Sequence, residues 1–274
     1  MILVNGQSEN RIEIVDRGLQ YGDGLFETLA YRNGKFEFLE AHLQRLSIDC
    51  QRLNIPFVDL DLLRQELTSI STDLTENTVV KVIITRGSGG RGYYADNSLI
   101  PTRIISTHPF PIYPESYQTE GVAVRFCEHH LSESTALAGV KHLNRLDQVI
   151  ARSEWSDQAI AEGLMFDQHG KLIEGTMSNI FLIKSGQLYT PKLVSSGVSG
   201  IMRSQIIKLA RKNSIPVSEL ATLVKSDLIE SDELFVCNSV NRIWPVKHII
   251  DTKQSFSVGE ITKLCQSQVA KALD

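Results

Sequence analysis

The sequence predicts an α+β protein built as two domains. Strand-like and helix-like segments follow one another without the regular alternation of a doubly wound sheet. Three prolines crowd into residues 109–114, which favours an extended linker, and 274 residues suffice for two modest cores. We therefore expect a small N-terminal domain over residues 1–108, a linker over 109–118 and a larger C-terminal domain over 119–274.

The N-terminal half predicts a small sheet with two helices. Apolar Leu39, Leu43 and Leu46 recur at three- and four-residue spacing, which is typical of one face of a helix. The expected elements are a hairpin around Asn5-Gly6, strands over 25–31, 79–85 and 102–107, and helices over 39–53 and 60–74. A glycine-rich loop joins the last two strands.

The C-terminal half predicts several strands and three helices. Gly200 opens the clearest helix, which should cover residues 201–212. The other expected elements are strands over 122–127 and 233–237, two or three strands within 164–183, and helices over 143–155 and 258–273.

Composition excludes several classes of protein. A net charge of −4 argues against bulk nucleic-acid binding. The four cysteines are scattered without Cys-x-x-Cys spacing and the seven histidines show no ligand spacing, so we expect neither a metal site nor disulfides. The N-terminus does not resemble a signal peptide, and no apolar run approaches the roughly 18 residues of a membrane span. A cytoplasmic protein with reduced thiols and no membrane partner is the simplest expectation.

Four separated motifs carry groups that could bind one flat, phosphorylated cofactor. They are Arg45, Lys141 in Lys-His-Leu-Asn-Arg-Leu, Glu174 in Glu-Gly-Thr-Met-Ser-Asn, and the Gly197–Arg203 segment. A lysine amine can react with an aldehyde, a carboxylate can pair with a pyridinium nitrogen, and a glycine-opened helix start can bind phosphate. Those are the needs of pyridoxal phosphate (PLP). Taken singly, each motif has an ordinary interpretation: a solvated lysine, a turn carboxylate, an inert loop, or an arginine in a local salt bridge.

The order and the residues of these motifs resemble those of the fold-type IV PLP enzymes. This family includes branched-chain and D-amino acid aminotransferases and aminodeoxychorismate lyases. The resemblance implies a homodimer of two-domain subunits, with PLP in a crevice between the domains. It implies that Lys141 bonds covalently to PLP and later acts as acid and base, and that Glu174 faces the pyridine nitrogen.

The same resemblance assigns the remaining contacts to PLP. It implies that Arg45 and the helix start at Gly200, Ile201 and Met202 bind the phosphate, and that Val198 lies over the ring. Many aminotransferases of the family have threonine where this chain has Met202, so only a backbone N–H can serve there. Ser239 is the candidate that supplies the missing hydroxyl. Thr28 is a candidate for proton transfer or for holding the lysine, although a structural threonine fits equally well.

The loop Arg86-Gly-Ser-Gly-Gly-Arg-Gly-Tyr and the Lys-His-Leu-Asn-Arg-Leu run most resemble the lyases of this family. The resemblance implies conversion of 4-amino-4-deoxychorismate to 4-aminobenzoate and pyruvate, a step of folate synthesis. Two arginines in a flexible loop suit this small-molecule substrate, which has two carboxylates, and Arg91 and Tyr93 are the candidate substrate-binding residues. A fold-type IV aminotransferase of D-amino or branched-chain amino acids is the alternative. A PLP-free protein whose glycine loop binds an anion is a third.

Overall fold

The computed structural model describes residues 1–56, 59–96 and 98–274, which form two compact units. Unit 1 comprises Met1–Pro111 together with Val140–Asn144, and unit 2 comprises Ile112–Gly139 together with Arg145–Asp274. The first boundary falls inside the range 109–118 that the prolines indicate. Ordered structure reaches into both ends of that range, because one strand ends at Pro109 and a short helix begins at Ser116.

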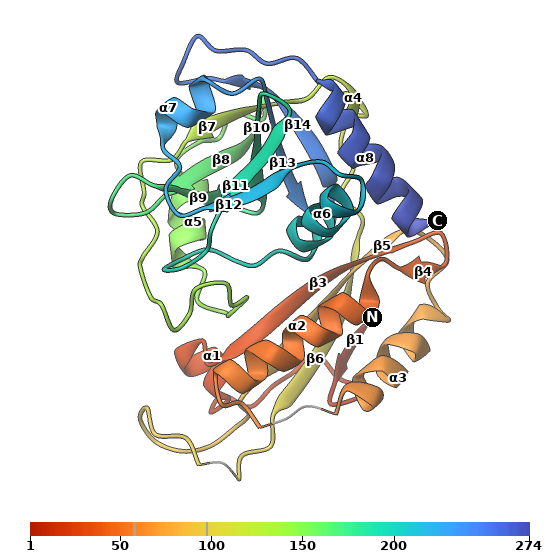
Figure 1. The fold of residues 1–274 in the computed structure, drawn as a ribbon. Helices are drawn as coiled ribbons and strands as arrows, with labels where there is room; N and C mark the ends of the chain where they lie inside the picture. Colours follow the sequence, from red (N-terminus) through yellow and green to blue (C-terminus); the bar gives the residue numbers. More distant parts are fainter. Residues whose placement is uncertain (57–58, 97) are drawn as a thin grey trace. The chain divides into compact units, whose positions relative to one another are not determined.

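Unit 1 is an antiparallel sheet with helices on one face (Figure 1). Its strand order is β2-β1-β6-β5-β3-β4. The elements are β1 (Ile2–Val4), β2 (Gln7–Ser8), α1 (Arg17–Tyr21), β3 (Gly24–Arg32), β4 (Lys35–Phe36), α2 (Leu39–Arg52), α3 (Leu60–Ser71), β5 (Thr78–Thr85) and β6 (Thr102–Pro109).

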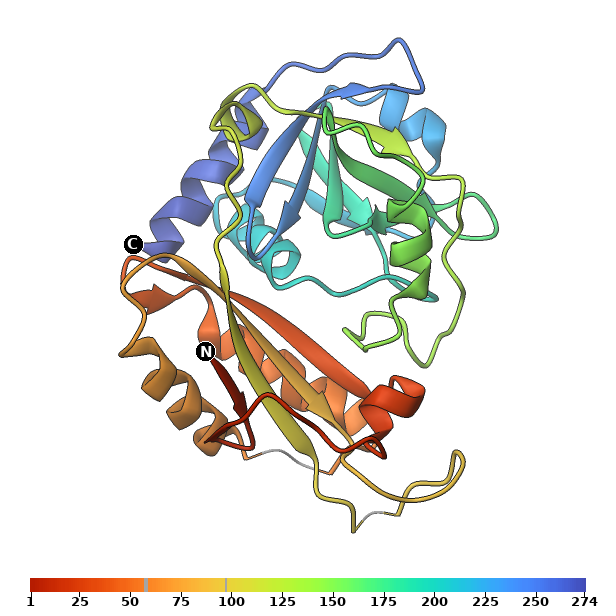
Figure 2. The same cartoon turned by 180° about the vertical axis from the view of Figure 1, so that it is seen from behind.

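Helices α2 and α3 cover the same face of this sheet, as the opposite views in Figures 1 and 2 show. Leu43 and Leu46 of α2 and Leu63 of α3 share a buried core with Leu25 and Leu29 of β3. Burying each such leucine contributes about 1.5–3 kcal/mol. The helical spacing of the leucines therefore fixes which side of β3 faces the helices.

Unit 2 is a mixed sheet of strand order β12-β11-β10-β13-β14-β7-β8-β9. The edge strand β9 also contacts β10 and β11, so the sheet curls back toward itself. The elements are α4 (Ser116–Thr119), β7 (Val122–Phe126), α5 (Leu146–Arg152), β8 (Ile160–Phe166), β9 (Leu172–Gly175), β10 (Asn179–Lys184), β11 (Gln187–Pro191), α6 (Ile201–Lys212), β12 (Val217–Leu220), α7 (Lys225–Ile229), β13 (Glu233–Asn238), β14 (Arg242–Ile249) and α8 (Glu260–Leu273).

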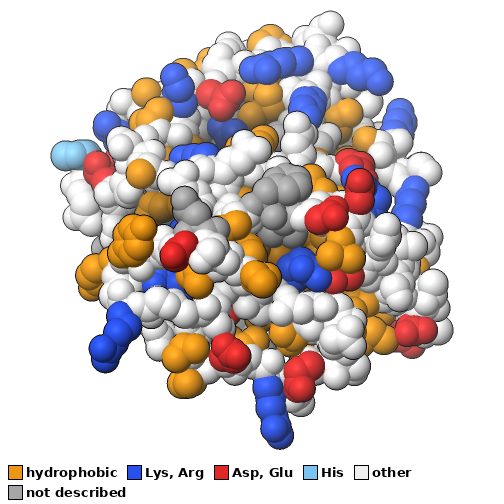
Figure 3. All heavy atoms as spheres, turned by 90° about the horizontal axis from the view of Figure 1, so that it is seen from below, with side chains coloured by type: hydrophobic (Ala, Val, Ile, Leu, Met, Phe, Trp, Pro, Cys, Tyr) orange, Lys and Arg blue, Asp and Glu red, His pale blue; other side chains and the backbone are white. Residues whose placement is uncertain are grey.

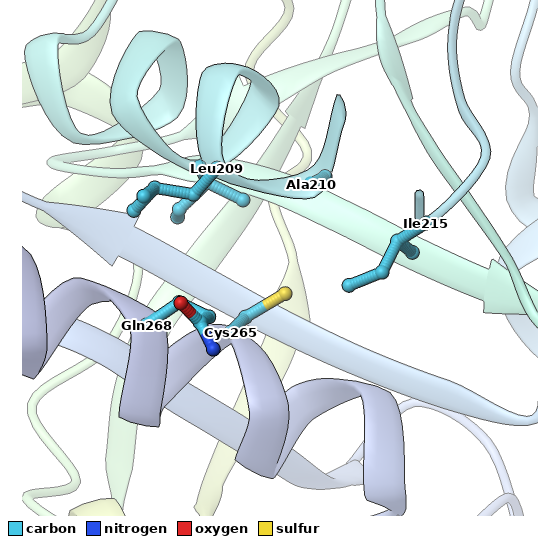
Figure 4. Close-up of a pocket in the computed structure, with 6 residues that line it drawn as sticks. Leu209, Ala210, Ile215, Cys265 and Gln268 are labelled. Carbon is cyan, nitrogen blue, oxygen red and sulfur yellow. The ribbon is translucent and has the colours of Figure 1, made fainter. Parts of the chain in front are cut away.

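Helix α6 is steadied by packing against α8 and β13. The two helices leave a small hollow, drawn in Figure 4, lined by Leu209, Ala210 and Ile215 on one side and by Cys265 and Gln268 on the other. These mostly apolar contacts pack the C-terminal half of α6 against α8.

Most predicted elements are confirmed, and α6 matches its predicted bounds of 201–212. The helix predicted over 143–155 is shorter, because it begins at Leu146 and ends at Arg152. Residues 140–144 instead belong to unit 1, where Leu143 N donates to Gly24 O at 3.0 Å. No helix in the described part of the chain is long and apolar enough to cross a membrane.

Candidate active site

Lys141 lies on a short segment that is fixed to unit 1 by its main chain. Phe26 N, on β3, donates to Lys141 O at 3.0 Å, and Lys141 N donates to Asp49 Oδ2 of α2 at 3.2 Å. A further bridge joins Leu25 to His142. The main chain at Lys141 is therefore fixed, so its side chain leaves the backbone at a defined position.

The side chain of Lys141 is half-buried against β3. Its Nζ lies 4.2 Å from the centre of the Phe26 ring, an arrangement that attracts a cation to an aromatic face. Thr28 is two residues further along β3, so its side chain lies on the same face of the sheet as Phe26. Thr28 pairs in register with Lys81, whose Nζ lies 5.2 Å from the same ring. Lys141 and Lys81 therefore both lie beside the Phe26 ring, and Thr28 lies on the same face of β3.

Arg45 is held by a buried carboxylate on the opposite face of β3. Its Nε donates to Glu27 Oε1 at 2.7 Å, and its Nη2 donates to Glu27 Oε2. Nδ1 of His42, one turn earlier on α2, lies 2.6 Å from the same carboxylate. Burial alone raises the pKa of Glu27, but Arg45 and His42 outweigh it and bring that pKa down to about 2. The carboxylate stays ionised and fixes the orientation of the guanidinium.

Glu27 and His42 were not predicted as part of the site. The run Phe26-Glu27-Thr28 places a carboxylate within an otherwise apolar strand, and His42 lies three residues before Arg45. Nε2 of His42 is buried and has no hydrogen-bond partner among the described residues.

Glu174 occupies a buried position in unit 2, near the end of β9. Its side chain is 4% exposed, and its Oε2 accepts a hydrogen bond from Val198 N at 2.7 Å. Gln148 of α5 donates to Oε1 over a longer 3.4 Å. The structure thus brings together Glu174 and Val198, which are far apart in sequence.

A second buried carboxylate shapes the turn that follows Glu174. Glu162 of β8 is fully buried and accepts hydrogen bonds from Thr176 Oγ1 and Ser178 Oγ, both at 2.6 Å. It also accepts from Met177 N at 3.2 Å. Burial raises its pKa despite these donors. Sequence reasoning missed this residue, although a single charge inside the apolar run of β8 was the available signal.

Asn179 and Gly200 form a close contact at the start of α6. Asn179 Nδ2 donates to Val198 O at 2.9 Å, and a Cβ on Gly200 would come within 2.0 Å of Asn179 Oδ1. Only glycine fits there without displacing the asparagine. Gly200 is the N-cap of α6 and provides no side-chain acceptor for the first turn. The first-turn residues Ile201 and Met202 are 6% and 1% exposed.

Ser239 lies on the turn after β13, at the same end of the sheet as Asn179. Cys237 of β13 pairs with Asn179 of β10, and Ser239 follows two residues later. Asn238 Oδ1 holds this turn by accepting from Val240 N and Asn241 N. Within unit 2 the predicted residues Glu174, Val198, Gly200, Ile201, Met202 and Ser239 therefore cluster around one sheet end and one helix start.

Arg145 is a further charged residue close to this cluster. It is the N-cap of α5, and burial lowers its pKa while the charges of Glu174 and Asp147 act in the opposite direction. It belongs to the Lys-His-Leu-Asn-Arg-Leu run, but no role was predicted for it.

Arg91 and Tyr93 lie on the glycine-rich loop of unit 1. Both are exposed, and Tyr93 is 90% exposed. The Tyr93 ring makes an edge contact with Tyr21 of α1, with centroids 5.8 Å apart.

Comparison with known proteins identifies the family. The model of the amino-transferase class IV family matches residues 24–249. The chain belongs to this family. It is 34% identical to the aminodeoxychorismate lyase of Vibrio harveyi over 98% of this chain and 99% of that protein. It is 31% identical to a putative branched-chain-amino-acid aminotransferase of Methanocaldococcus jannaschii, over 96% of this chain and 92% of that protein.

A solved structure gives the same result. The crystal structure of 4-amino-4-deoxychorismate lyase from Pseudomonas aeruginosa matches with a TM-score of 0.95 and 43% identity, over 100% of both chains. The predicted fold-type IV class is confirmed. Proteins of this family are PLP-dependent, so the predicted cofactor is confirmed at the level of the family.

Proposed function

We propose that this chain is a PLP-dependent lyase that converts 4-amino-4-deoxychorismate to 4-aminobenzoate and pyruvate. The observation that carries the proposal is the full-length similarity to the Pseudomonas aeruginosa lyase, at 43% identity. The local arrangement of Lys141 and Glu174 supports it, because one presents an amine from a fixed backbone and the other a buried carboxylate.

The residues of each unit fit the groups of PLP. In unit 2, the first turn of α6 is buried and its N-cap supplies no side-chain acceptor, which suits a phosphate dianion at the positive end of a helix. A buried Glu174 suits a protonated ring nitrogen. We propose that Lys141 holds the aldehyde carbon, Glu174 the ring nitrogen, and Val198 the ring face. The phosphate would be bound by Arg45, Gly200, Ile201, Met202 and Ser239.

When bound, PLP supplies an aromatic ring that accepts electrons from the carbon bearing the substrate amine. Lys141 then does the proton chemistry. Its amine would take the proton from that carbon and, as the C–O bond breaks, give a proton to the terminal carbon of the departing enolate, which becomes pyruvate. The main-chain hydrogen bonds of Lys141 to Phe26 and Asp49 limit the movement of its amine. Proton transfer needs such positioning of the acid–base group. Thr28 lies on the same face of β3 as Phe26 and is the proposed partner for holding the amine or a water.

Product analysis with Lys141→Ala tests this proposal. We expect the wild type to form 4-aminobenzoate and pyruvate in equal amounts, and Lys141→Ala to form neither. Lys81→Ala is the matched control, because it removes the other amine beside the Phe26 ring. Borohydride reduction followed by peptide mapping should leave the cofactor on Lys141. An active Lys141→Ala variant, or a cofactor trapped on another lysine, would refute the assignment.

A fold-type IV aminotransferase is the second candidate, favoured by the similarity to the putative branched-chain-amino-acid aminotransferase. Such an enzyme would use the same lysine and carboxylate but would release a keto acid and retain the amine. Incubation with D-alanine or a branched-chain amino acid and 2-oxoglutarate separates the two functions by product. Glutamate formation without any 4-aminobenzoate would support the aminotransferase.

We also propose that the enzyme is a cytoplasmic homodimer with no nucleic-acid partner. All four cysteines are buried and unbonded, as suits a reducing compartment. On the face drawn in Figure 3, Lys and Arg side chains are interspersed with Asp and Glu, so this face has no continuous basic surface. Light scattering on the purified protein tests the dimer, and a monomeric mass for an active enzyme would refute it.

A further inference from the structure

A buried arginine, Arg17, holds the backbone of the glycine-rich loop of unit 1. Its side chain is 3% exposed, and all three guanidinium nitrogens donate hydrogen bonds. Nη1 donates to Gly92 O at 2.9 Å, and Nη2 donates to Tyr93 O at 3.1 Å. Nε donates to Asp23 Oδ2 at 2.9 Å. Two consecutive carbonyls of the loop are therefore bound by one planar group.

Asp23 keeps Arg17 from moving. Its carboxylate also accepts from Arg86, from Nε at 2.7 Å and from Nη2 at 3.0 Å. Burial opposes ionisation of Asp23, but Arg86 and Arg17 outweigh it and lower its pKa. Arg86 in turn donates to Leu53 O, just beyond the end of α2. The tether thus continues from the loop through Arg17 and Asp23 into the helical layer.

The base of the loop is held by the residue before Arg17. Asp16 is fully buried, and its Oδ2 accepts from Thr85 Oγ1 and from Thr102 Oγ1, both at 2.8 Å. Thr85 is the last residue of β5, and Thr102 is the first residue of β6. The dipeptide Asp16-Arg17 therefore fixes both ends of the loop and a point within it.

The hydrogen bonds from Asp16 and Arg17 matter because the glycines of the loop allow its backbone many conformations. Gly87, Gly89, Gly90 and Gly92 all adopt positive φ, a region that glycine enters freely and can leave as freely. Tyr93 keeps its side chain 90% exposed while its carbonyl is bound by Arg17. Its ring touches Tyr21, and the Arg17 guanidinium lies 4.8 Å from the centre of the Tyr21 ring. The backbone of Tyr93 is therefore fixed by a hydrogen bond, while its side chain is exposed to solvent.

We propose that Arg17 is a positioning residue for substrate binding, which holds Gly92 and Tyr93 so that Arg91 and Tyr93 are presented to a dicarboxylate substrate. The inference rests on the proposed function, because it takes 4-amino-4-deoxychorismate as that substrate. A loop ordered before binding loses less conformational entropy when the substrate arrives. Loss of the tether should therefore weaken substrate binding more than it slows the chemical step.

Arg17→Lys is the principal test variant. A lysine keeps the positive charge beside Asp23 but cannot donate in a fixed fork to two carbonyls and a carboxylate. We expect faster amide hydrogen exchange in the loop, and a KM for 4-amino-4-deoxychorismate raised on the order of tenfold with kcat changed less than about twofold, since binding pays the ordering cost. Arg11→Lys, at an exposed arginine, is the matched control and should match the wild type.

Gly92→Ala tests the same idea without touching Arg17. A Cβ on Gly92 would meet nothing within 4 Å, so the substitution acts through the positive φ of 69° alone. We expect the same direction of change in loop exchange and in KM. This variant keeps the proposal testable if Arg17→Lys fails to fold.

Three results would overturn the inference: loop exchange equal to that of the wild type, a loosened loop with an unchanged KM, or a fall in kcat at constant KM. A wild-type protein that forms no 4-aminobenzoate would overturn the proposed function and the substrate assigned to the loop. In that case hydrogen exchange would still decide whether Arg17 holds the loop, so the two failures are distinguishable.

Discussion

Replacing Glu27 with glutamine should destabilise the protein strongly at neutral pH and weakly in acid. The pKa of Glu27 falls from its ordinary 4.5 to about 2 on folding, because Arg45 and His42 outweigh the effect of burial. At about 1.4 kcal/mol per pH unit, ionised Glu27 contributes about 3 kcal/mol to the free energy of unfolding. That agrees with the about 3–5 kcal/mol lost when one partner of a buried ion pair is removed.

The sign of the pH dependence follows from the lowered pKa. The stabilisation is present in full above the unfolded-state value of 4.5 and is lost as the pH falls through about 2. Urea unfolding of wild type and Glu27→Gln, followed by far-UV circular dichroism between pH 7 and pH 3, measures the difference. Tryptophan fluorescence gives a separate reference, since Trp155 and Trp244 both belong to unit 2 whereas Glu27 belongs to unit 1.

Glu40→Gln is the matched control for this measurement. Glu40 is on the same helix α2 as Arg45 and pairs with Arg64, but its side chain is 70% exposed. Exposed ion pairs contribute little, so we expect its effect to be well below that of Glu27→Gln. Equal stability of wild type and Glu27→Gln at pH 7, or a difference that does not shrink toward pH 3, would refute the reasoning.

Three further predictions concern unit 2 and the thiols. Gly200→Ala should weaken PLP binding in an absorbance titration, because the new Cβ would come within 2.0 Å of Asn179 Oδ1 and displace the start of α6; unchanged affinity would contradict this. Glu162→Ala should cost about 3 kcal/mol or more and also weaken PLP binding, because the buried donors of the turn after Glu174 lose their acceptor; unaltered thermal unfolding would count against it. Native protein should react slowly with the thiol reagent DTNB and fully in denaturant, because burial raises the pKa of the cysteine thiols; rapid native reaction would disprove this. The pKa rises to about 12 for Cys50, Cys127 and Cys265.

The sequence predicted best what local patterns determine. Gly200 and the apolar spacing after it were enough to predict α6 over 201–212, because helix starts and amphipathic faces depend on neighbouring residues. The strand bearing Thr28 and the helix bearing Arg45 were predicted for the same reason.

Contacts between distant segments were out of reach. Glu27 and Arg45 are 18 positions apart, and Arg17 and Tyr93 are 76 positions apart, yet each pair is joined by hydrogen bonds. Strand β14 was not predicted at all, and it contains Pro245 opposite Phe235, although proline is unusual inside a sheet. Such pairings depend on how the whole sheet assembles. The hydrophobic periodicity and the secondary-structure propensity of a single segment do not contain that information.

Val140–Asn144 belong to unit 1 although the residues on either side of them belong to unit 2, so the two units cannot be separated by a single cut in the chain. A fragment that ends at Pro111 would lack Lys141 and the segment that pairs with β3 at Gly24 and Phe26. The complementary fragment would carry the lysine on a stretch with nothing to pair against. Neither fragment therefore reproduces one unit. A truncated form of unit 1 must also include residues 140–144, joined to it through a designed linker.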